Sequence, residues 1–170
     1  YIYRNAGADK AKQQAIAQEF ADKNVDMVYS LTTPGTTIIK STLPESTPIV
    51  FSIVTYPADS GLIESFEYSG NNLVGTSNFV PLQSYVKLLT SMLPQAKKVA
   101  IFHRKGEPNS NIQTINMVRL FKRAGIEALN IAVASLDEID AQALSLSEQV
   151  DAFVTTTDTL MQSGGELRLI

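Results

Sequence analysis

Short apolar runs alternate with helix-like segments along most of this chain, and this alternation constrains the fold more than any other feature. A run of apolar residues with few breaks reads as a buried strand, and it occurs at residues 25–31, 49–54, 99–102, 126–133 and 150–157. Between the runs, apolar side chains recur at helical spacing, as at Ile112, Ile115 and Val118. Repeated strand–helix–strand units are typical of parallel sheets flanked by helices. The sequence therefore predicts an α/β fold.

Local signals place the helix ends. Asp9 has the chemistry of an N-cap, so a helix is expected to follow it and to carry Phe20 toward the core. Pro81 suits the first turn of another helix. Gly125 is expected to end the helix that begins after Pro108. Residues 1–4 read as the tail of a strand, and residues 37–41 as a short helix.

An internal similarity suggests two modules. Residues 25–33 and 150–158 each contain a Val-Asp pair, an apolar strand and a hydroxyl-rich strand end. This pattern indicates a duplicated, two-lobed architecture, although buried parallel strands resemble one another in any case. We place lobe one at residues 1–78 and lobe two at residues 79–170. Asp26 and Asp151 fall at strand starts, where we expect turn or cap roles.

Composition excludes several classes of function. The formal net charge is −3, and a nucleic-acid partner is not expected because phosphate binding needs clustered Lys and Arg. There is no cysteine, so thiolate metal sites and redox pairs are ruled out. No histidine or carboxylate spacing matches a metal site, and no Gly-rich phosphate loop is present. We expect neither a metal nor a cofactor.

A candidate binding site follows from the position of the strand ends. Ligands of open parallel sheets bind outside the carboxyl ends of the strands. The polar and aromatic residues predicted at those ends are Thr33, Thr36, Thr55, Tyr56, Asn109, Ser110 and Asp158. Helix N-termini near Thr33 and Asn109 favour an anion, and Asp158 could accept hydrogen bonds from an ammonium group. Such a set suits a small zwitterion, whereas for each residue taken singly plain helix capping is the alternative.

An enzyme is a weaker hypothesis. His103 is the single histidine, and it is the one side chain that would ordinarily titrate near neutrality. It falls at a strand end, where a cleft or surface contact is the simpler role. No nucleophile elbow surrounds a serine. We therefore predict that the chain is not an enzyme.

Several segments resemble one family in the same order along almost the whole chain. The matching stretches are Arg4-Asn5-Ala6 with Asp9, then residues 25–35, 48–57, 70–77, 93–100, 106–110 and 150–159. In this order the chain resembles the ABC-transporter substrate-binding proteins of the tryptophan/tyrosine-type family, which have the periplasmic-binding-protein type I fold. Tyr56, Val74 and Thr159 depart from the usual pattern, and these departures bear on the ligand more than on the fold.

The resemblance implies a two-lobed α/β receptor outside the cytoplasm, periplasmic or lipid-anchored on the cell surface, that delivers a small ligand to a membrane ABC permease. An amino acid is the expected ligand, with an aromatic amino acid as the narrower option, held in the cleft between the lobes. Carried over by position, the cleft residues are Thr33, Thr36, Thr55, Asn109, Ser110 and Asp158. Tyr56 could stack on an aromatic ligand or belong to the core. A ligand-sensing domain of a regulatory protein is the alternative function.

Family members are longer than this chain. By comparison with them, lobe one is expected to lack its first strand, and lobe two its C-terminal part. No signal sequence is present in these residues, which begin at Tyr1. We expect the chain to be shortened at both ends.

Overall fold

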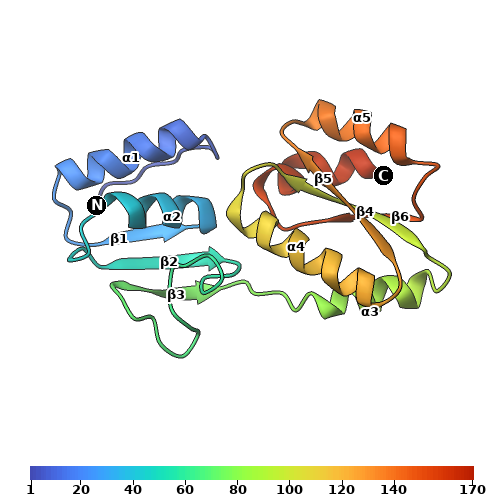
Figure 1. Cartoon of the computed structure of the whole chain (residues 1–170). Helices are drawn as coiled ribbons and strands as arrows, with labels where there is room; N and C mark the ends of the chain where they lie inside the picture. Colours follow the sequence, from blue (N-terminus) through green and yellow to red (C-terminus); the bar gives the residue numbers. More distant parts are fainter. The chain divides into compact units, whose positions relative to one another are not determined.

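The computed structural model describes all residues from 1 to 170 and divides them into two compact units, Tyr1–Phe79 and Val80–Ile170. The boundary predicted from the sequence lies between residues 78 and 79. Each unit contains a three-stranded sheet whose strands are all parallel. The mixed α/β fold predicted from the alternation is therefore present, with helices packed on both sheets (Figure 1).

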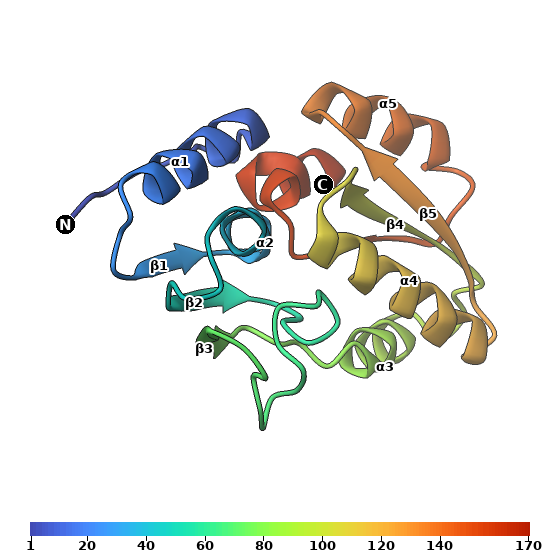
Figure 2. The ribbon, with the colours of Figure 1, turned by 60° about the vertical axis from the view of Figure 1, so that its left-hand side comes forward.

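The first unit consists of two helices and a sheet in the order β1-β2-β3. Its elements are α1 (Lys10–Asp22), β1 (Val28–Leu31), α2 (Thr33–Thr42), β2 (Ile49–Val54) and β3 (Leu73–Ser77). Asp9 caps α1 as predicted, since its side chain accepts a hydrogen bond from the Lys12 N–H at 2.8 Å. Both helices lie over the same face of the sheet (Figures 1 and 2).

The core of the first unit lies between those helices and that face. Ala17 from α1 and Ile39 from α2 are buried against Val28, Ile49 and Phe51 from the strands. β1 shows strict alternation, with Val28 and Ser30 buried and Tyr29 and Leu31 exposed. Alternate residues of a strand point to opposite faces, so only one face of this sheet contributes to the core.

The second unit has a sheet in the order β5-β4-β6. Its elements are α3 (Gln83–Met92), β4 (Lys98–Arg104), α4 (Pro108–Arg123), β5 (Glu127–Val133), α5 (Leu136–Leu146) and β6 (Ala152–Thr155), followed by short helical turns at Met161–Gly165 and Glu166–Leu169. The central strand β4 is buried from Val99 to His103 without alternation. This pattern indicates a strand covered on both faces.

Helices supply that cover from two sides. Ile139 and Ala143 of α5, with Met161 from the turn beyond β6, pack against Ala100 and Phe102 of β4. On the other face α4 contacts β4 and β5, and Figures 1 and 2 show α4 and α5 on opposite sides of the sheet. Phe102 adds an edge-to-face contact with Phe153, with the ring centroids 5.3 Å apart.

Some element boundaries differ from the sequence expectation. Residues 1–4 form no strand, so the strand predicted there was wrong. The helix expected at residues 37–41 begins earlier, at Thr33, because Pro34 fits the first turn of a helix. Asp151 accepts hydrogen bonds from the Lys97 and Lys98 N–H groups at the start of β4. It therefore joins two strand starts, which differs from the local turn or cap role predicted for it. No helix here is long and apolar enough to cross a membrane.

Candidate functional site

In the first unit, β1 runs directly into α2 through a strained residue. Thr32, the N-cap of α2, has φ of 68° and ψ of 158°, a conformation that is nearly exclusive to glycine. Ile53 in β2 also has positive φ, 57°, where the β2–β3 register shifts. Thr32 N–H donates to the Ser52 carbonyl at 3.0 Å. Backbone strain therefore gathers at the carboxyl ends of two neighbouring strands, which is where strain is often stored at functional sites.

The predicted threonines of this unit lie together at that edge and are buried. Thr36 Oγ1 donates to the Thr32 carbonyl at 2.8 Å and lies 2.9 Å from Ser30 Oγ. Thr33 Oγ1 accepts a hydrogen bond from the Thr55 N–H at 3.4 Å. Thr33, Thr36 and Thr55 are each at most 3% exposed. The Thr36 hydroxyl thus fixes the turn between β1 and α2, and the Thr33 hydroxyl joins that turn to the end of β2.

The start of α2 offers donors of its own. A helix leaves the N–H groups of its first turn without intrahelical acceptors, and the Thr32 side chain makes no capping bond here. Pro34 has no N–H, so Thr33 and Gly35 carry the remaining donors of that turn. Free N–H groups together with the positive end of the helix dipole favour a negatively charged group.

Tyr56 is part of an aromatic cluster at the end of β2. Its ring lies edge-to-face with Phe79 at a centroid distance of 5.6 Å. Phe79 in turn meets Phe66 at 5.9 Å. Tyr56 is 3% exposed, whereas Phe66 and Phe79 are each more than half exposed. The exposed pair is therefore the more accessible stacking surface of this cluster.

In the second unit, β4 leads into α4 in a similar way. Pro108 occupies the first turn of α4, and the N-cap Glu107 makes no capping bond to the helix. Ser110 Oγ donates to the carbonyls of Arg104 and Glu107 at 3.1 Å each, so this hydroxyl closes the β4–α4 turn. Asn109 and Ser110 carry the N–H groups that the first turn leaves without intrahelical acceptors.

Asn109 and Gln113, one turn apart on α4, hold the chain beyond β6. Asn109 Nδ2 donates to the Thr157 carbonyl at 2.6 Å. Gln113 Oε1 accepts from the Thr157 N–H at 3.0 Å and from its hydroxyl at 2.9 Å. These bonds fix the orientation of both amides, and they leave Asn109 Oδ1 and Gln113 Nε2 buried without a partner. Buried polar atoms of this kind usually have a partner, so this corner of the unit has unused capacity for hydrogen bonding.

Asp158 organises the turn after β6. Its carboxylate accepts hydrogen bonds from the Arg104 N–H, the Thr156 hydroxyl and the N–H groups of Leu160 and Met161, at 2.6–2.9 Å. Asp158 is 1% exposed. Four internal donors match the number of lone-pair sites on a carboxylate. A ligand ammonium would therefore have to share Asp158 with donors that it already serves.

The sequence analysis predicted no role for Glu107, an acid close to Asp158. Glu107 is 6% exposed and accepts hydrogen bonds from the Thr159 N–H and hydroxyl. Arg104 Nη1 lies 3.7 Å from its carboxylate. Burial raises the pKa of Glu107, the bonds from Thr159 act to lower it, and the negative charge of Asp158 raises it further. The adjacency of Glu107 to Pro108-Asn109-Ser110 was the only sequence signal for this group.

His103 has a structural setting. It is 3% exposed, and its Nε2 lies 2.7 Å from Asn130 Oδ1 on the neighbouring strand β5. The ring therefore bonds to the amide of an exposed asparagine, whereas the histidine of a catalytic triad is oriented by a carboxylate. No cluster of three or more His, Cys, Asp or Glu residues has the arrangement of a metal site.

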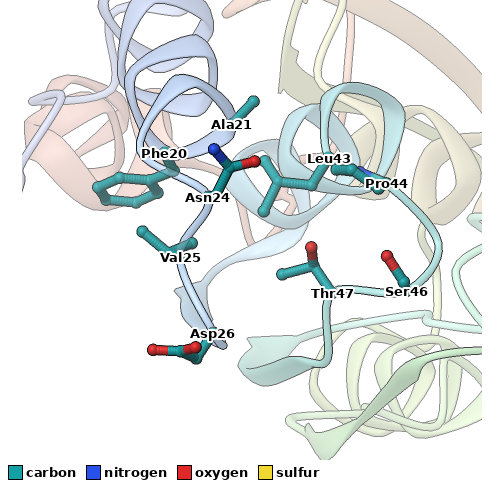
Figure 3. A pocket seen from close by; sticks show the side chains of 9 residues that line it. All are labelled: Phe20, Ala21, Asn24, Val25, Asp26, Leu43, Pro44, Ser46 and Thr47. Atoms are coloured by element: carbon teal, nitrogen blue, oxygen red, sulfur yellow. The ribbon is translucent and has the colours of Figure 1, made fainter.

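The first unit also has a pocket of about 340 Å³, away from the predicted residues. The ends of α1 and α2 and the loops that follow them line it, at residues 20–26 and 43–47. Figure 3 shows Asn24, Leu43 and Thr47 around this space, with Asp26 at its outer side. These loops precede β1 and β2, so the pocket lies at the amino ends of the strands. The predicted site lies at the carboxyl ends.

Comparison with known proteins identifies the relatives. The profile of the family described as ABC transporter substrate-binding protein matches residues 1–169. A curated relative, the tyrosine-binding protein of Clostridioides difficile (strain R20291), is 28% identical over 161 residues, which are 95% of this chain and 46% of that protein. The chain thus spans about half the length of this relative.

Two solved structures show the same fold. The ABC domain from Streptococcus pneumoniae in complex with L-tryptophan has a TM-score of 0.87 and 23% identity, and the match covers 100% of this chain and 59% of that one. A conserved domain protein from Vibrio cholerae has a TM-score of 0.88 and 24% identity, covering 98% and 57% of the two chains. Both units of this chain therefore have the same fold as the matched parts of these two structures.

Proposed function

The chain belongs to the family of ABC transporter substrate-binding proteins, and from that membership we propose that it is the solute-binding part of an ABC importer outside the cytoplasm. The single observation that carries this proposal is the match to the family over residues 1–169. The family consists of binding proteins rather than enzymes. Delivery of the ligand to a membrane permease is the partner interaction that this role requires.

An aromatic amino acid is the proposed ligand. The Clostridioides difficile relative is a tyrosine-binding protein, and the Streptococcus pneumoniae structure contains L-tryptophan. The chain has matching chemistry: helix N-termini for a carboxylate, buried amide oxygen for an ammonium group, and exposed aromatic rings for an aromatic side chain.

We assign roles to the strand-end residues on that basis. The first turn of α2, at Thr33, and the first turn of α4, at Asn109–Ser110, each offer N–H groups suited to a carboxylate. Asn109 Oδ1, buried and without a partner, accepts from the ammonium group. Thr36, Thr55 and Asp158 hold the turns that present these groups, and Tyr56 positions Phe79. Each unit thus has its own proposed ligand-binding residues at the carboxyl ends of its strands.

A binding assay with paired variants tests the proposal. Isothermal titration and thermal shift would be run with L-tyrosine, L-tryptophan and a panel of sugars. A ligand at a hundred times its Kd stabilises a protein by about 2.7 kcal/mol, which is a shift of several degrees. Asn109→Ala removes the proposed acceptor and should weaken binding by roughly tenfold or more, as expected for a hydrogen bond to a charged group.

The matched control is Asn111→Ala, which makes the same replacement on the same helix at a residue outside the predicted set. It should leave Kd within about twofold, since surface substitutions away from such features change free energies by only about 0.5 kcal/mol. Binding of aromatic amino acids that is equally strong in both variants would refute the role of Asn109. If sugars bind and amino acids do not, the ligand proposal fails.

A further inference from the structure

The second unit holds two buried acids close to each other, Asp158 in the turn after β6 and Glu107 before α4. Asp158 already accepts four hydrogen bonds from its own unit. Glu107 accepts from a single residue, Thr159. The Thr159 N–H is shared between both carboxylate oxygens, at 3.2 and 3.3 Å, and its hydroxyl lies 2.6 Å from Oε2. Because a carboxylate has about four lone-pair sites, Glu107 Oε1 can accept a further hydrogen bond.

The negative charge of Glu107 is only partly balanced. Its ion pair is with Arg104, whose Nη1 lies 3.7 Å from Oε2. That separation exceeds the roughly 2.7–2.9 Å of a charge-assisted hydrogen bond. The Arg104 side chain is 33% exposed, so water screens its charge, and Asp158 adds a negative charge nearby. A buried carboxylate is costly unless a cation neutralises it, so this place in the second unit favours a further positive charge.

Glu107 does not use the helix that it precedes. It is the N-cap of α4 in an extended conformation, and its side chain makes no capping bond. A negative side chain at this position is ordinarily stabilised by the first-turn N–H groups. Here the carboxylate bonds to Thr159 instead, so those N–H groups stay available. Donors for an anion and an acceptor for a cation are therefore presented separately at one helix start.

Resting on the function proposed above, we propose that Glu107 accepts a hydrogen bond from the ammonium group of an amino-acid ligand and so determines the specificity of the second unit. Asn109 holds the same segment after β6 through the Thr157 carbonyl, and its Oδ1 is the other proposed acceptor. An ammonium group carries several N–H donors and can serve both side chains. A site built in this way selects amino acids against carboxylic acids that lack the ammonium group.

Calorimetric titration with L-tyrosine and with its des-amino analogue tests this assignment. Glu107→Gln keeps the shape of the side chain and an acceptor oxygen for Thr159, but removes the charge. The Kd of L-tyrosine should rise by roughly tenfold or more, as for a hydrogen bond between charged groups. The Kd of the analogue should be unchanged or lower, because the analogue has a carboxylate but no ammonium group.

The matched control is Glu148→Gln, which makes the same replacement at an exposed acid of the same unit. It should leave the Kd of L-tyrosine within about twofold. Equal Kd values for the two variants would overturn the role of Glu107 and leave the proposed ligand intact. A loss that is equally large for L-tyrosine and for the analogue would also overturn it, because Glu107 would then only support the fold. If the unsubstituted protein binds no aromatic amino acid, the proposed ligand fails and this assignment fails with it.

A pH series on the unsubstituted protein gives a second measurement that needs no variant. The charged and polar groups that face Glu107 are Arg104 from β4 and Asp158 and Thr159 from the turn after β6. Burial raises the pKa of Glu107, so its carboxylate takes up a proton as pH falls and then no longer attracts an ammonium group. The Kd of L-tyrosine should therefore rise as pH falls, whereas that of the analogue should not, over the range in which the analogue's carboxyl group stays ionised. The same pH dependence for both ligands would contradict the proposal.

Discussion

At the scale of single residues, the polar groups at the strand ends are mostly engaged in building the turns that carry them. Thr36 and Ser110 donate to backbone carbonyls of the turns before α2 and α4. Asp158 accepts four hydrogen bonds from its own unit. The groups left for a ligand are then backbone N–H groups and a few unpartnered amide atoms, as at Asn109. Capping and binding are therefore compatible roles for one helix N-terminus.

Glu107 gives a prediction on pH. Because burial raises its pKa, the folded protein keeps the proton to higher pH than the unfolded chain does. Its contribution to the free energy of unfolding is therefore greatest below the ordinary glutamate pKa and declines as pH rises through the raised value. Glu107→Gln should abolish this contribution. The Tm of the unsubstituted protein minus that of the variant should fall as pH rises above the ordinary glutamate pKa of about 4.3.

The difference in Tm between the unsubstituted protein and Glu107→Gln is needed because other carboxylates have lowered pKa values. Their effect on stability therefore changes with pH in the opposite direction. The bonds from Arg4 and Lys23 lower the pKa of Glu19 to about 2, and bonds from backbone N–H groups lower the pKa of Asp151. Those groups add stability above their unfolded pKa and lose it as pH falls. They are common to both proteins and cancel. Parallel Tm curves across the whole range would contradict the assignment to Glu107.

At the scale of elements, the pairing of β2 with β3 depends on one glycine. A Cβ at Gly75 would lie 2.0 Å from the Phe51 carbonyl oxygen and 2.6 Å from the Phe51 ring. Phe51 is 3% exposed in the core, so neither the backbone nor the ring has room to move. Glycine is therefore required at position 75 because two strands approach each other closely there, and not because the backbone adopts a positive φ.

Gly75→Ala should therefore destabilise the first unit by roughly 1–3 kcal/mol or more, the usual cost of overpacking. Gly35→Ala is the matched control, because its Cβ would meet only ordinary contacts at 3.7 Å and it lies within α2. That control should be neutral or stabilising by up to about 1 kcal/mol, since alanine favours a helix. Chemical denaturation measures both. A loss of similar size in the two variants would disprove the clash at Gly75.

At the scale of the whole molecule, the chain has two separate cores. Phe51 lies in the core of the first unit, and Phe102 in the core of the second. Each core is formed by residues close in sequence, since the units divide at Phe79 and Val80. Units with their own cores can lose structure separately, and a single two-state transition is then not expected.

Two core truncations should show that the two units unfold independently of each other. Phe51→Ala and Phe102→Ala should each cost about 3–5 kcal/mol, the usual range for phenylalanine in a core. Amide exchange should accelerate in β1–β3 for the first variant and in β4–β6 for the second, with little change in the other unit. If either variant accelerates exchange equally in both sheets, the chain unfolds as one cooperative body.

Sequence reasoning and structure agree best where local chemistry decides. The cap at Asp9 and the buried run of β4 follow from residue type and from hydrophobic pattern. They disagree at residues 1–4, where a short apolar and aromatic segment has no neighbouring strand to pair with in this structure. Glu107 and Gln113 were missed because their partner, the chain at Thr157–Thr159, lies about fifty residues away in sequence.

The sequence by itself determined the α/β class, the cap of α1 and the family, because periodicity, capping chemistry and ordered motifs are local properties of the chain. It did not place the start of α3, which begins at Gln83 rather than at Pro81. Only the tertiary structure decided which polar groups are already satisfied, which face of each sheet is covered, and where Gly75 is indispensable. Those properties depend on distances between residues far apart in sequence. Hydrogen bonding, desolvation and steric overlap all change steeply over such distances, and a linear pattern does not contain them.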